Sequence, residues 1–333
     1  MGRLKNDLPV DDRILMGLFL CSEKPNNILE QLKPEWNNKI TSPVSEKLIL
    51  LHADNLVESI FPFTNDVSDK IDKDLFVLSH LRQPDLFLRL RPGKEEKVKQ
   101  KLSRAEIPFE MVSETCLALP NASKIDAVIE LNKEAVVQDY NSQRVGELGS
   151  LLIDRYPLTV WDCCAASGGK SIMLYDLKPD IDLVVSDVRE SILINLKKRF
   201  RQAGITKYKS IVADLAHSSF TMQHPPFDLV IADVPCSGSG TWGRTPEQLF
   251  YFEKEKIAEY ASLQKKIISN VIPHLKPGGY LLYITCSVFK KENEEAVDFA
   301  QQQTGLQLVK MEVLKGYDKK ADTLFAALLQ KPL

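Results

Sequence analysis

Two cysteines in similar settings are the first residues in this sequence that could do chemistry. Cys236 lies in Asp233-Val-Pro-Cys-Ser-Gly-Ser-Gly240 and Cys286 in Thr285-Cys-Ser287, and each segment directly follows an apolar run. A free cysteine is more often a small buried hydrophobe than a reactive group. Two cysteines at the ends of adjacent predicted strands, in loops of small polar residues, favour a reactive pair. Covalent catalysis by a thiolate is the chemistry they suggest.

Acidic residues end several predicted strands of the same region. Asp187, Asp214 and Asp233 each close a short apolar run, and Asp162 closes the run before them. A single aspartate at such a position is usually a helix cap or a turn residue. Four aspartates at the ends of four successive strands indicate a crevice for a nucleoside cofactor at the carboxyl edge of a sheet. In such crevices an acidic residue after the second strand holds the ribose hydroxyls.

The segment after the first of these strands is rich in small residues. It reads Trp161-Asp-Cys-Cys-Ala-Ala-Ser-Gly-Gly-Lys-Ser171 and runs into a predicted helix. Glycines let a backbone approach a ligand closely, and a helix N-terminus presents free N–H groups. The pattern is neither the phosphate-binding loop G-x-x-x-x-G-K-[ST] nor G-x-G-x-x-G. Taken alone, it is weak evidence for a binding site.

Strands and helices alternate from about residue 136 onward. The apolar runs at 158–163, 183–187, 210–214, 229–233 and 280–285 predict a parallel sheet covered by helices on both faces. Residues 306–313 and 323–329 predict a terminal antiparallel hairpin. The fold class expected is therefore α/β, with a Rossmann-like sheet.

Two further regions precede this one. Residues 1–70 are predicted to form short helices separated by prolines, and residues 71–135 a small α+β module. With the region at 136–333, the sequence predicts three domains. Between residues 82 and 104 there are eight Lys or Arg against three Asp or Glu. A solvated helix face and a phosphate-contacting surface are both open interpretations of that stretch.

Composition narrows the class of protein. The chain has 333 residues, a net charge of −2 and six cysteines, without a C-x-x-C pair or zinc spacing. The apolar run at 14–21 is shorter than the roughly 20 residues that span a bilayer, and it lacks a signal-peptide cleavage site. We expect a cytoplasmic protein with reduced thiols, no metal and no membrane segment. The five histidines form no Ser/His/Asp or metal pattern.

Taken together, the motifs resemble one enzyme family. Asp162-Cys-Cys-Ala-Ala-Ser-Gly-Gly-Lys170, Asp233-Val-Pro-Cys-Ser-Gly238, and Thr285-Cys-Ser287 with Glu292-Asn-Glu294 resemble the Sun (Fmu) family of RNA cytosine-5 methyltransferases. Gln138-Asp139 and Ser142-Gln143 resemble the segment that opens its catalytic domain, and residues 71–135 resemble its small RNA-recognition-like module. Ser167 stands where the family usually has proline, and Val234 where it usually has alanine. Neither change removes a reacting group.

The resemblance implies a function and a set of site residues. It implies S-adenosyl-L-methionine (S-adenosylmethionine) as methyl donor and a cytosine in RNA as acceptor. By resemblance Cys286 is the nucleophile that adds to carbon 6, Cys236 assists release, and Asp233 binds the base. Asp187 would hold the cofactor ribose, Asp214 the adenine amine, and the loop 164–170 the methionine end. The cofactor-binding residues expected are thus Cys164, Ala165, Ala166, Ser167, Gly168, Gly169, Lys170, Asp187, Asp214 and Asp233.

The resemblance also implies a partner. Ribosomal RNA is the expected substrate, contacted by the basic stretch through Arg89, Arg91 and Lys97, and we expect the protein to act as a monomer. Two alternatives stay open. A DNA cytosine-5 methyltransferase would use Cys236 as nucleophile and leave Cys286 unexplained. A non-catalytic RNA-binding assembly factor would keep the fold without needing both thiols.

Overall fold

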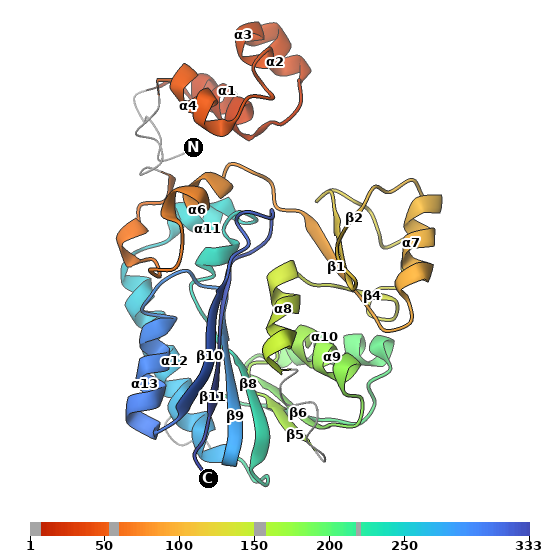
Figure 1. Cartoon of the computed structure of the whole chain (residues 1–333), viewed down its shortest axis with the longest axis vertical. Helices are drawn as coiled ribbons and strands as arrows, with labels where there is room; N and C mark the ends of the chain where they lie inside the picture. Colours follow the sequence, from red (N-terminus) through yellow and green to blue (C-terminus); the bar gives the residue numbers. More distant parts are fainter. Residues whose placement is uncertain (1–7, 53–59, 150–157, 218–220) are drawn as a thin grey trace.

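A seven-stranded sheet forms the centre of the computed structural model (Figure 1). The structure describes residues 8–52, 60–149, 158–217 and 221–333. The strand order is β10-β11-β9-β8-β5-β6-β7, and neighbours among β5 to β9 run parallel. These five strands are β5 (Thr159–Asp162), β6 (Asp182–Asp187), β7 (Lys209–Val212), β8 (Phe227–Asp233) and β9 (Leu275–Thr285).

The last two strands form the predicted hairpin. β10 (Gln307–Leu314) pairs antiparallel with β11 (Leu324–Gln330), and β11 pairs antiparallel with β9. Six of the seven residues of β11 are buried, because it is inserted between two other strands. The Rossmann-like α/β fold with a C-terminal antiparallel hairpin is thereby confirmed.

Helices cover both faces of this sheet, as the continuous apolar strands predict. On one face lie α8 (Tyr140–Gly149), α9 (Gly169–Leu177) and α10 (Glu190–Ala203); on the other lie α12 (Glu255–Val271) and α13 (Glu294–Thr304) (Figure 1). The two faces form separate apolar clusters: Ile172 and Leu196 belong to one, Ile268 and Val297 to the other. Short helices α11 (Pro246–Tyr251), η3 (Ser239–Thr241) and η4 (Ile272–His274) connect β8 to β9 along with α12.

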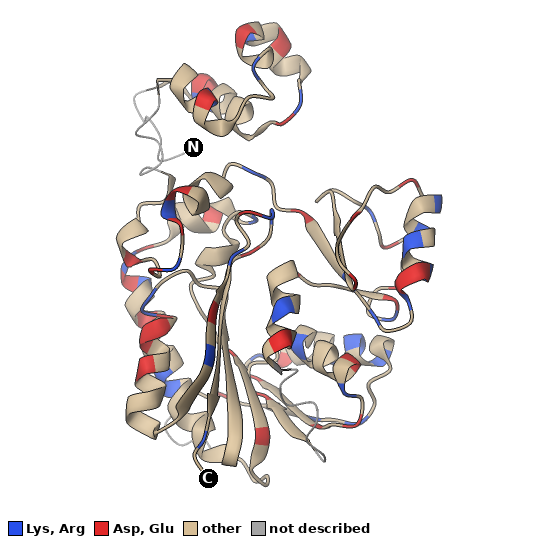
Figure 2. Ribbon diagram, viewed as in Figure 1, with Lys and Arg blue, Asp and Glu red and all other residues tan. Residues whose placement is uncertain are grey.

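A second, four-stranded antiparallel sheet precedes the large one. Its order is β2-β3-β1-β4, from β1 (Leu86–Leu90), β2 (Glu110–Ser113), β3 (Cys116–Leu119) and β4 (Ala135–Val137). Helix α7 (Glu95–Arg104) packs on it through Val98 and Leu102, and the rest of α7 carries charges of both signs (Figure 2). These elements lie within the module predicted at 71–135; β4 ends two residues beyond it.

One aspartate joins the small sheet to the helices of the large one. Asp176 on α9 accepts from Arg89 Nη1 at 2.6 Å and from Arg91 Nη2 at 2.6 Å. Arg91 also donates to the carbonyl of Ala203 at 2.7 Å. None of the three charged side chains is more than 12% exposed. The two guanidinium groups thus bind a carboxylate inside the molecule, so neither arginine is placed to contact an RNA phosphate.

Lys97, the third residue expected to contact RNA, is placed differently. Its Nζ lies 2.7 Å from Glu134, and its side chain is 55% exposed. Burial raises the pKa of Glu134, but hydrogen bonds from Lys101 and Lys97 outweigh it and lower that pKa to about 2. Lys97 therefore remains accessible from outside while paired to a carboxylate.

The N-terminal helices form a separate apolar cluster. They are α1 (Val10–Cys21), α2 (Asn27–Leu32), α3 (Pro34–Asn37) and α4 (Val44–Leu50), around Phe19 and Leu29. The buried Lys47 donates to the carbonyls of Phe19 and Ser22 and so ties α4 to α1. The predicted helical stretch also includes residues 1–7 and 53–59, which lie outside the described residues.

The next segment packs elsewhere. The segment that contains η1 (Thr64–Asp66) and α6 (Lys73–Ser79) contributes Phe61 and Val67, which flank η1, and Phe76 of α6 to the cluster that also contains the α12 and α13 side chains. No helix among the described residues is long and apolar enough to cross a bilayer.

Asp162 is a buried carboxyl group at the end of β5. Its Oδ2 accepts from Ser171 Oγ at 2.6 Å, and its Oδ1 has no hydrogen-bond partner among the described residues. Burial raises the pKa of Asp162 to about 7. The folded protein therefore holds this proton at a pH at which the unfolded chain has released it.

We predict that Asp176→Asn lowers the free energy of unfolding by about 3–5 kcal/mol, because it leaves two buried guanidinium groups without their carboxylate. Chemical denaturation measures the effect. Asp180→Asn is the control, since Asp180 is exposed and 3.7 Å from Lys178, and it should change the free energy by less than about 0.5 kcal/mol. Equal losses in the two variants would contradict a structural role for Asp176.

A second prediction concerns pH. Between about pH 4 and pH 7 the folded state binds one more proton at Asp162 than the unfolded state, so this carboxyl makes the protein less stable as the pH rises, by up to about 1.4 kcal/mol per unit. Asp162→Asn should remove that slope, and its advantage over the wild type should grow across this window and level off above pH 7. Denaturation curves at several pH values test it. Parallel profiles for the two proteins would be the contrary result.

Candidate active site

The site lies where the strand order of the large sheet reverses, between β5 and β8. In open α/β sheets ligands bind at this point, outside the carboxyl ends of the strands. Asp187 ends β6, Asp233 ends β8 and Thr285 ends β9. A cavity of about 530 Å³ opens beside these strand ends, and we call it the Asp187 cavity. A second one of about 290 Å³, the Lys170 cavity, adjoins it.

The two cavities share part of their walls. Cys164, Ala166, Asp233 and Cys286 line both. Asp187 and Asp214 line only the larger cavity, while Ala165, Ser167, Gly169 and Lys170 line only the smaller. A molecule that fills both would therefore pass directly beside the Cys286 sulfur.

The structure brings the two predicted cysteines into contact. Cys236 Sγ and Cys286 Sγ are 3.3 Å apart, and both thiols are free and partly exposed. They lie in the wall of the Asp187 cavity. Two sulfur atoms this close, open to a ligand cavity, are placed to act on the same substrate atoms.

Glu292 holds the two cysteine loops together. This fully buried carboxylate accepts from Ser237 N at 2.8 Å, next to Cys236, and from Ser287 Oγ at 2.8 Å, next to Cys286. Gln264 donates to it at 3.0 Å. Its neighbour Asn293 accepts from Thr285 Oγ1 at 2.6 Å. The Glu-Asn-Glu motif thus sets the distance between the thiols.

Gly240 allows a close backbone crossing behind the thiols. Its N–H donates to the carbonyl of Cys286 at 2.9 Å, and its carbonyl accepts from Thr323 N at 2.9 Å. A Cβ at this position would lie 1.9 Å from the carbonyl oxygen of Thr323. Only glycine fits, so this second link fixes the Cys236 loop against β11.

The two thiols differ in their electrostatic surroundings. The hydrogen bond with Cys286 and burial raise the pKa of Cys236 well above its ordinary value, so Cys236 keeps its proton. Burial lowers the pKa of Lys170, but Asp233 and the Cys286 sulfur outweigh it, so the pKa is raised and the ammonium group persists. A neighbouring cation favours the thiolate form of a cysteine.

Lys170, whose role the sequence left open, lies at the centre of a hydrogen-bond network. Its Nζ donates to Asp233 Oδ2 at 3.0 Å and to Ser142 Oγ at 2.7 Å. Gln138 donates from Nε2 to the same Ser142 oxygen at 3.3 Å. Its Oε1 accepts from Arg89 Nε at 2.8 Å. The small sheet is thereby connected to Asp233 through side chains alone.

The residues expected to bind a cofactor surround the cavities in different ways. Asp187 accepts at Oδ2 from Ala166 N at 3.1 Å, which fixes the small-residue loop against β6. Asp214 lies beyond the end of β7 and accepts from Ala216 N at 2.9 Å. Gly168 lines neither cavity: it has a φ of +82°, and a Cβ there would meet Phe200 at 2.6 Å. Its role is to pack the loop on α10.

Sequence reasoning missed two parts of the site. An apolar wall of the Asp187 cavity comes from α12, through Leu263 and Ile267 with Tyr260 beside them. Nothing in the sequence distinguishes these residues from ordinary core positions of an amphipathic helix.

The other missed part is acidic. Arg244 donates to Asp139 at 2.9 Å and to Asp322 at 2.7 Å, and both aspartates line the Lys170 cavity. Burial and the neighbouring carboxylate of Asp139 raise the pKa of Asp322 to about 7, although Arg244 binds it. The Gln138-Asp139 motif was the one available signal for this part. The described residues contain no group of three or more His, Cys, Asp or Glu arranged to hold a metal ion.

The chain is similar to proteins of one known family. Residues 152–327, more than half of the chain, match the family model described as 16S rRNA methyltransferase RsmB/F. The ribosomal RNA small subunit methyltransferase B of Shewanella oneidensis is 34% identical over 167 residues, which are 50% of this chain and 38% of that protein. The chain thus matches less than two fifths of that relative's length.

Solved structures show the same fold. A methyltransferase homologue from Pyrococcus horikoshii has a TM-score of 0.66 at 21% identity, covering 86% of this chain and 98% of that one. NSun6 from Pyrococcus horikoshii, solved with SFG, has a TM-score of 0.69 at 14% identity, covering 82% and 97%. With the family match, these findings lead to one assignment. The chain belongs to the RsmB/F family of S-adenosylmethionine-dependent methyltransferases.

Proposed function

We propose that this protein methylates carbon 5 of a cytosine in RNA, through a covalent bond between Cys286 and carbon 6. The contact of 3.3 Å between Cys236 and Cys286, beside the Lys170–Asp233 pair, is the observation that carries the proposal. Ribosomal RNA is the substrate class named for the relative from Shewanella oneidensis, and we propose it here on that ground.

The Asp187 cavity fits the methyl donor. Its volume of about 530 Å³ lies within the usual range for small-molecule sites, roughly 300–1,000 Å³. Asp187 would accept from the ribose hydroxyls, Asp214 from the adenine amine, and the loop from Cys164 to Lys170 would hold the methionine end. S-adenosylmethionine supplies an electrophilic methyl group on its sulfonium. Cys286 belongs to the wall that the Asp187 cavity shares with the Lys170 cavity, so the methionine end of the cofactor would lie next to it.

Cys286 makes the cytosine reactive. Its thiolate adds to carbon 6, which makes carbon 5 enamine-like and able to take the methyl group. Asp233 hydrogen-bonds ring nitrogen 3 and the exocyclic amine, where charge develops, and Lys170 holds Asp233 in place. The cytosine must leave any stack to reach this position.

Cys236 assists the release step. The proton on carbon 5 passes to water, and its bonding electrons form the double bond between carbon 5 and carbon 6. The bond between carbon 6 and sulfur breaks and its electron pair returns to Cys286, whose departing sulfur accepts a hydrogen bond from the Cys236 thiol 3.3 Å away. The raised pKa of Cys236 makes it a thiol, and therefore the poorer nucleophile, before substrate binds. This supports Cys286 as the attacking group and speaks against the DNA-type assignment.

The small sheet is proposed to contact the RNA backbone. With Arg89 and Arg91 bound to Asp176, the exposed cations of α7, Lys97 and Arg104, are what remains of the predicted basic contact. Phosphate contacts of this kind position RNA without reading its sequence.

The assignment of the thiols predicts opposite behaviour for two variants. Cys236→Ala should attack and methylate RNA but fail to release it, and so accumulate a protein–RNA band on denaturing gels. Cys286→Ala should form no adduct and no product. A DNA-type mechanism requires that Cys236→Ala forms no adduct, and a non-catalytic protein gives no adduct with any variant. Labelled duplex DNA is the matched control substrate and should give no comparable band.

Cofactor binding is tested separately. Asp187→Asn should weaken binding of S-adenosylmethionine by about tenfold or more, because hydrogen bonds from the ribose to a charged acceptor are lost. Calorimetry measures the affinity, and thermal unfolding checks that the loop contact to Ala166 is retained. Asp182→Asn, at the opposite end of β6, is the matched control. Equal affinities for both variants and the wild type would remove Asp187 from the site.

A further inference from the structure

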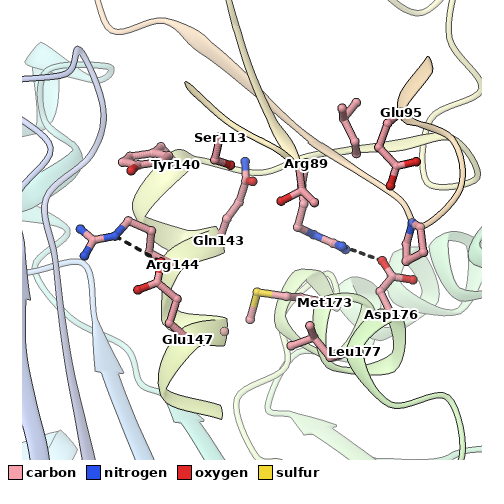
Figure 3. A pocket seen from close by; sticks show the side chains of 14 residues that line it. Arg89, Glu95, Ser113, Tyr140, Gln143, Arg144, Glu147, Met173, Asp176 and Leu177 are labelled. Carbon is pink, nitrogen blue, oxygen red and sulfur yellow. Dashed lines mark hydrogen bonds and ion pairs between the residues drawn. The ribbon is translucent and has the colours of Figure 1, made fainter. Parts of the chain in front are cut away.

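A third cavity lies outside the site described so far, between the small sheet and the helices α8 and α9. Its volume is about 520 Å³, and we call it the Arg89 cavity. Arg89 reaches into it from β1 toward Asp176 on α9, while Gln143 stands beside it on α8 (Figure 3). Leu90, Met173 and Leu177 provide apolar surface.

Two polar atoms in the wall of this cavity are buried and have no partner among the described residues. They are a donor, Arg89 Nη2, and an acceptor, Gln143 Oε1. The Arg89 residue is only 6% exposed. Buried polar groups in native proteins are nearly always hydrogen-bonded, so an unpartnered donor and acceptor in one cavity call for a ligand that supplies both.

Neither side chain can turn away to find another partner. Arg89 is fixed at Nε by Gln138 at 2.8 Å and at Nη1 by Asp176 at 2.6 Å, which leaves Nη2 as the free arm of the guanidinium plane. Gln143 Nε2 donates to the carbonyl of Gln138 at 2.9 Å. That bond sets the amide orientation and leaves Oε1 as the free acceptor.

The charges around the cavity exclude a phosphate as its occupant. Arg89 and Arg144 are countered by three carboxylates, which gives the wall a net charge of −1 from Glu95, Glu147 and Asp176. A neutral planar group that presents an acceptor and a donor on one edge fits this wall, and every nucleobase has such an edge. Tyr140 also lines the cavity, and Lys319 Nζ lies 5.3 Å from the centre of its ring.

The cavity lies within reach of an RNA bound at the thiols. Helix α8 separates the two places: Ser142 faces the Lys170 cavity, and Gln143 and Gly146 face the Arg89 cavity. A helix with its side chains is about 10–12 Å across, a distance that a few nucleotides of single-stranded RNA bridge.

We propose that the Arg89 cavity binds one unpaired nucleobase of the RNA substrate, other than the cytosine that is methylated. The proposal rests on the proposed function for the identity of the ligand. Arg89 Nη2 donates to an acceptor on the base edge, Gln143 Oε1 accepts from a neighbouring N–H, and the sugar-phosphate backbone stays outside.

The test fills the cavity from two opposite walls without touching its polar groups. Leu177→Trp does so from α9, and Thr115→Trp from the turn between β2 and β3; Thr115 is exposed and Leu177 is 44% exposed, so both should fold. Leu308→Trp on β10 is the matched control, at 37% exposure and away from all three cavities. The probe is a short labelled single-stranded RNA of mixed sequence, bound by the full chain.

Both filling variants should bind this RNA about tenfold more weakly than the wild type, the loss expected for one stacked and hydrogen-bonded base, while Leu308→Trp binds like the wild type. S-adenosylmethionine affinity should be unchanged in all three. RNA carrying 4-thiouridine should crosslink to residues 140–147 in the wild type and lose that crosslink in Thr115→Trp. Affinity equal to or tighter than wild type in both filling variants would overturn the proposal.

The proposed function fails by a different readout. If the wild type binds RNA but forms no Cys286 adduct and no methylated product, the methyl-transfer proposal is wrong. The base site is still decided by the affinities of the filling variants. If those variants bind normally while methylation proceeds, only the base site is wrong.

Discussion

The buried carboxylate of Asp176 is the interaction on which the rest of the arrangement depends. It forms ion pairs with Arg89 and Arg91 at once, at 2.6 Å each, and so attaches the small sheet to α9, the helix that follows the small-residue loop of the site. Removing it leaves two charges buried without a partner, which costs more than such a pair gains over apolar packing. The network from Arg89 through Gln138 and Ser142 to Lys170 then ties the position of Asp233 to that attachment. The distance between the small sheet and Asp233 is thereby set by hydrogen-bonded side chains and not by a linker.

The thiols are positioned by a second buried carboxylate. Sheet topology brings β8 and β9 side by side, but it fixes only the strand ends, and each cysteine lies one to three residues further on. Glu292 closes this gap by binding one residue from each cysteine loop, while burial raises its pKa. Four hydrogen-bond donors around it, including two serine hydroxyls and a backbone N–H, stabilise its charged form. A carboxylate of this kind gives a fixed sulfur–sulfur distance without a covalent bond, which leaves both thiols free to react.

The sequence predicts the large sheet and the strand-end residues well, because both follow from short-range patterns. Continuous apolar runs ended by aspartates predict parallel strands whose carboxyl ends meet, and the structure has Asp187 and Asp233 at such ends. The pairing of Arg89 and Arg91 with an acidic side chain could not be predicted, for a physical reason. Counting charges along 82–104 does not show that Arg89, on β1, and Arg91, directly after β1, bind the same carboxylate, because that carboxylate belongs to Asp176, 85 residues beyond Arg91 in the chain. The α12 wall and Asp322 were equally out of reach, because their contribution arises from packing between distant segments.

The distribution of buried polar groups explains why these long-range contacts matter for function. Five polar side chains of the small sheet, the site and the thiol loops are nearly inaccessible to solvent: Arg89, Gln138, Asp162, Glu292 and Asn293. Apolar residues in those places would give at least as much stability, since buried charges lose hydration that their pairing only partly restores. Their directional bonds instead restrict rotation of each side chain to one orientation, which the proposed covalent mechanism, with two sulfurs 3.3 Å apart, requires. The same restriction leaves single atoms such as Arg89 Nη2 and Gln143 Oε1 unable to relax toward a partner within the protein, so the rigidity that aligns the thiol loops also preserves two unpartnered polar atoms at the proposed base site.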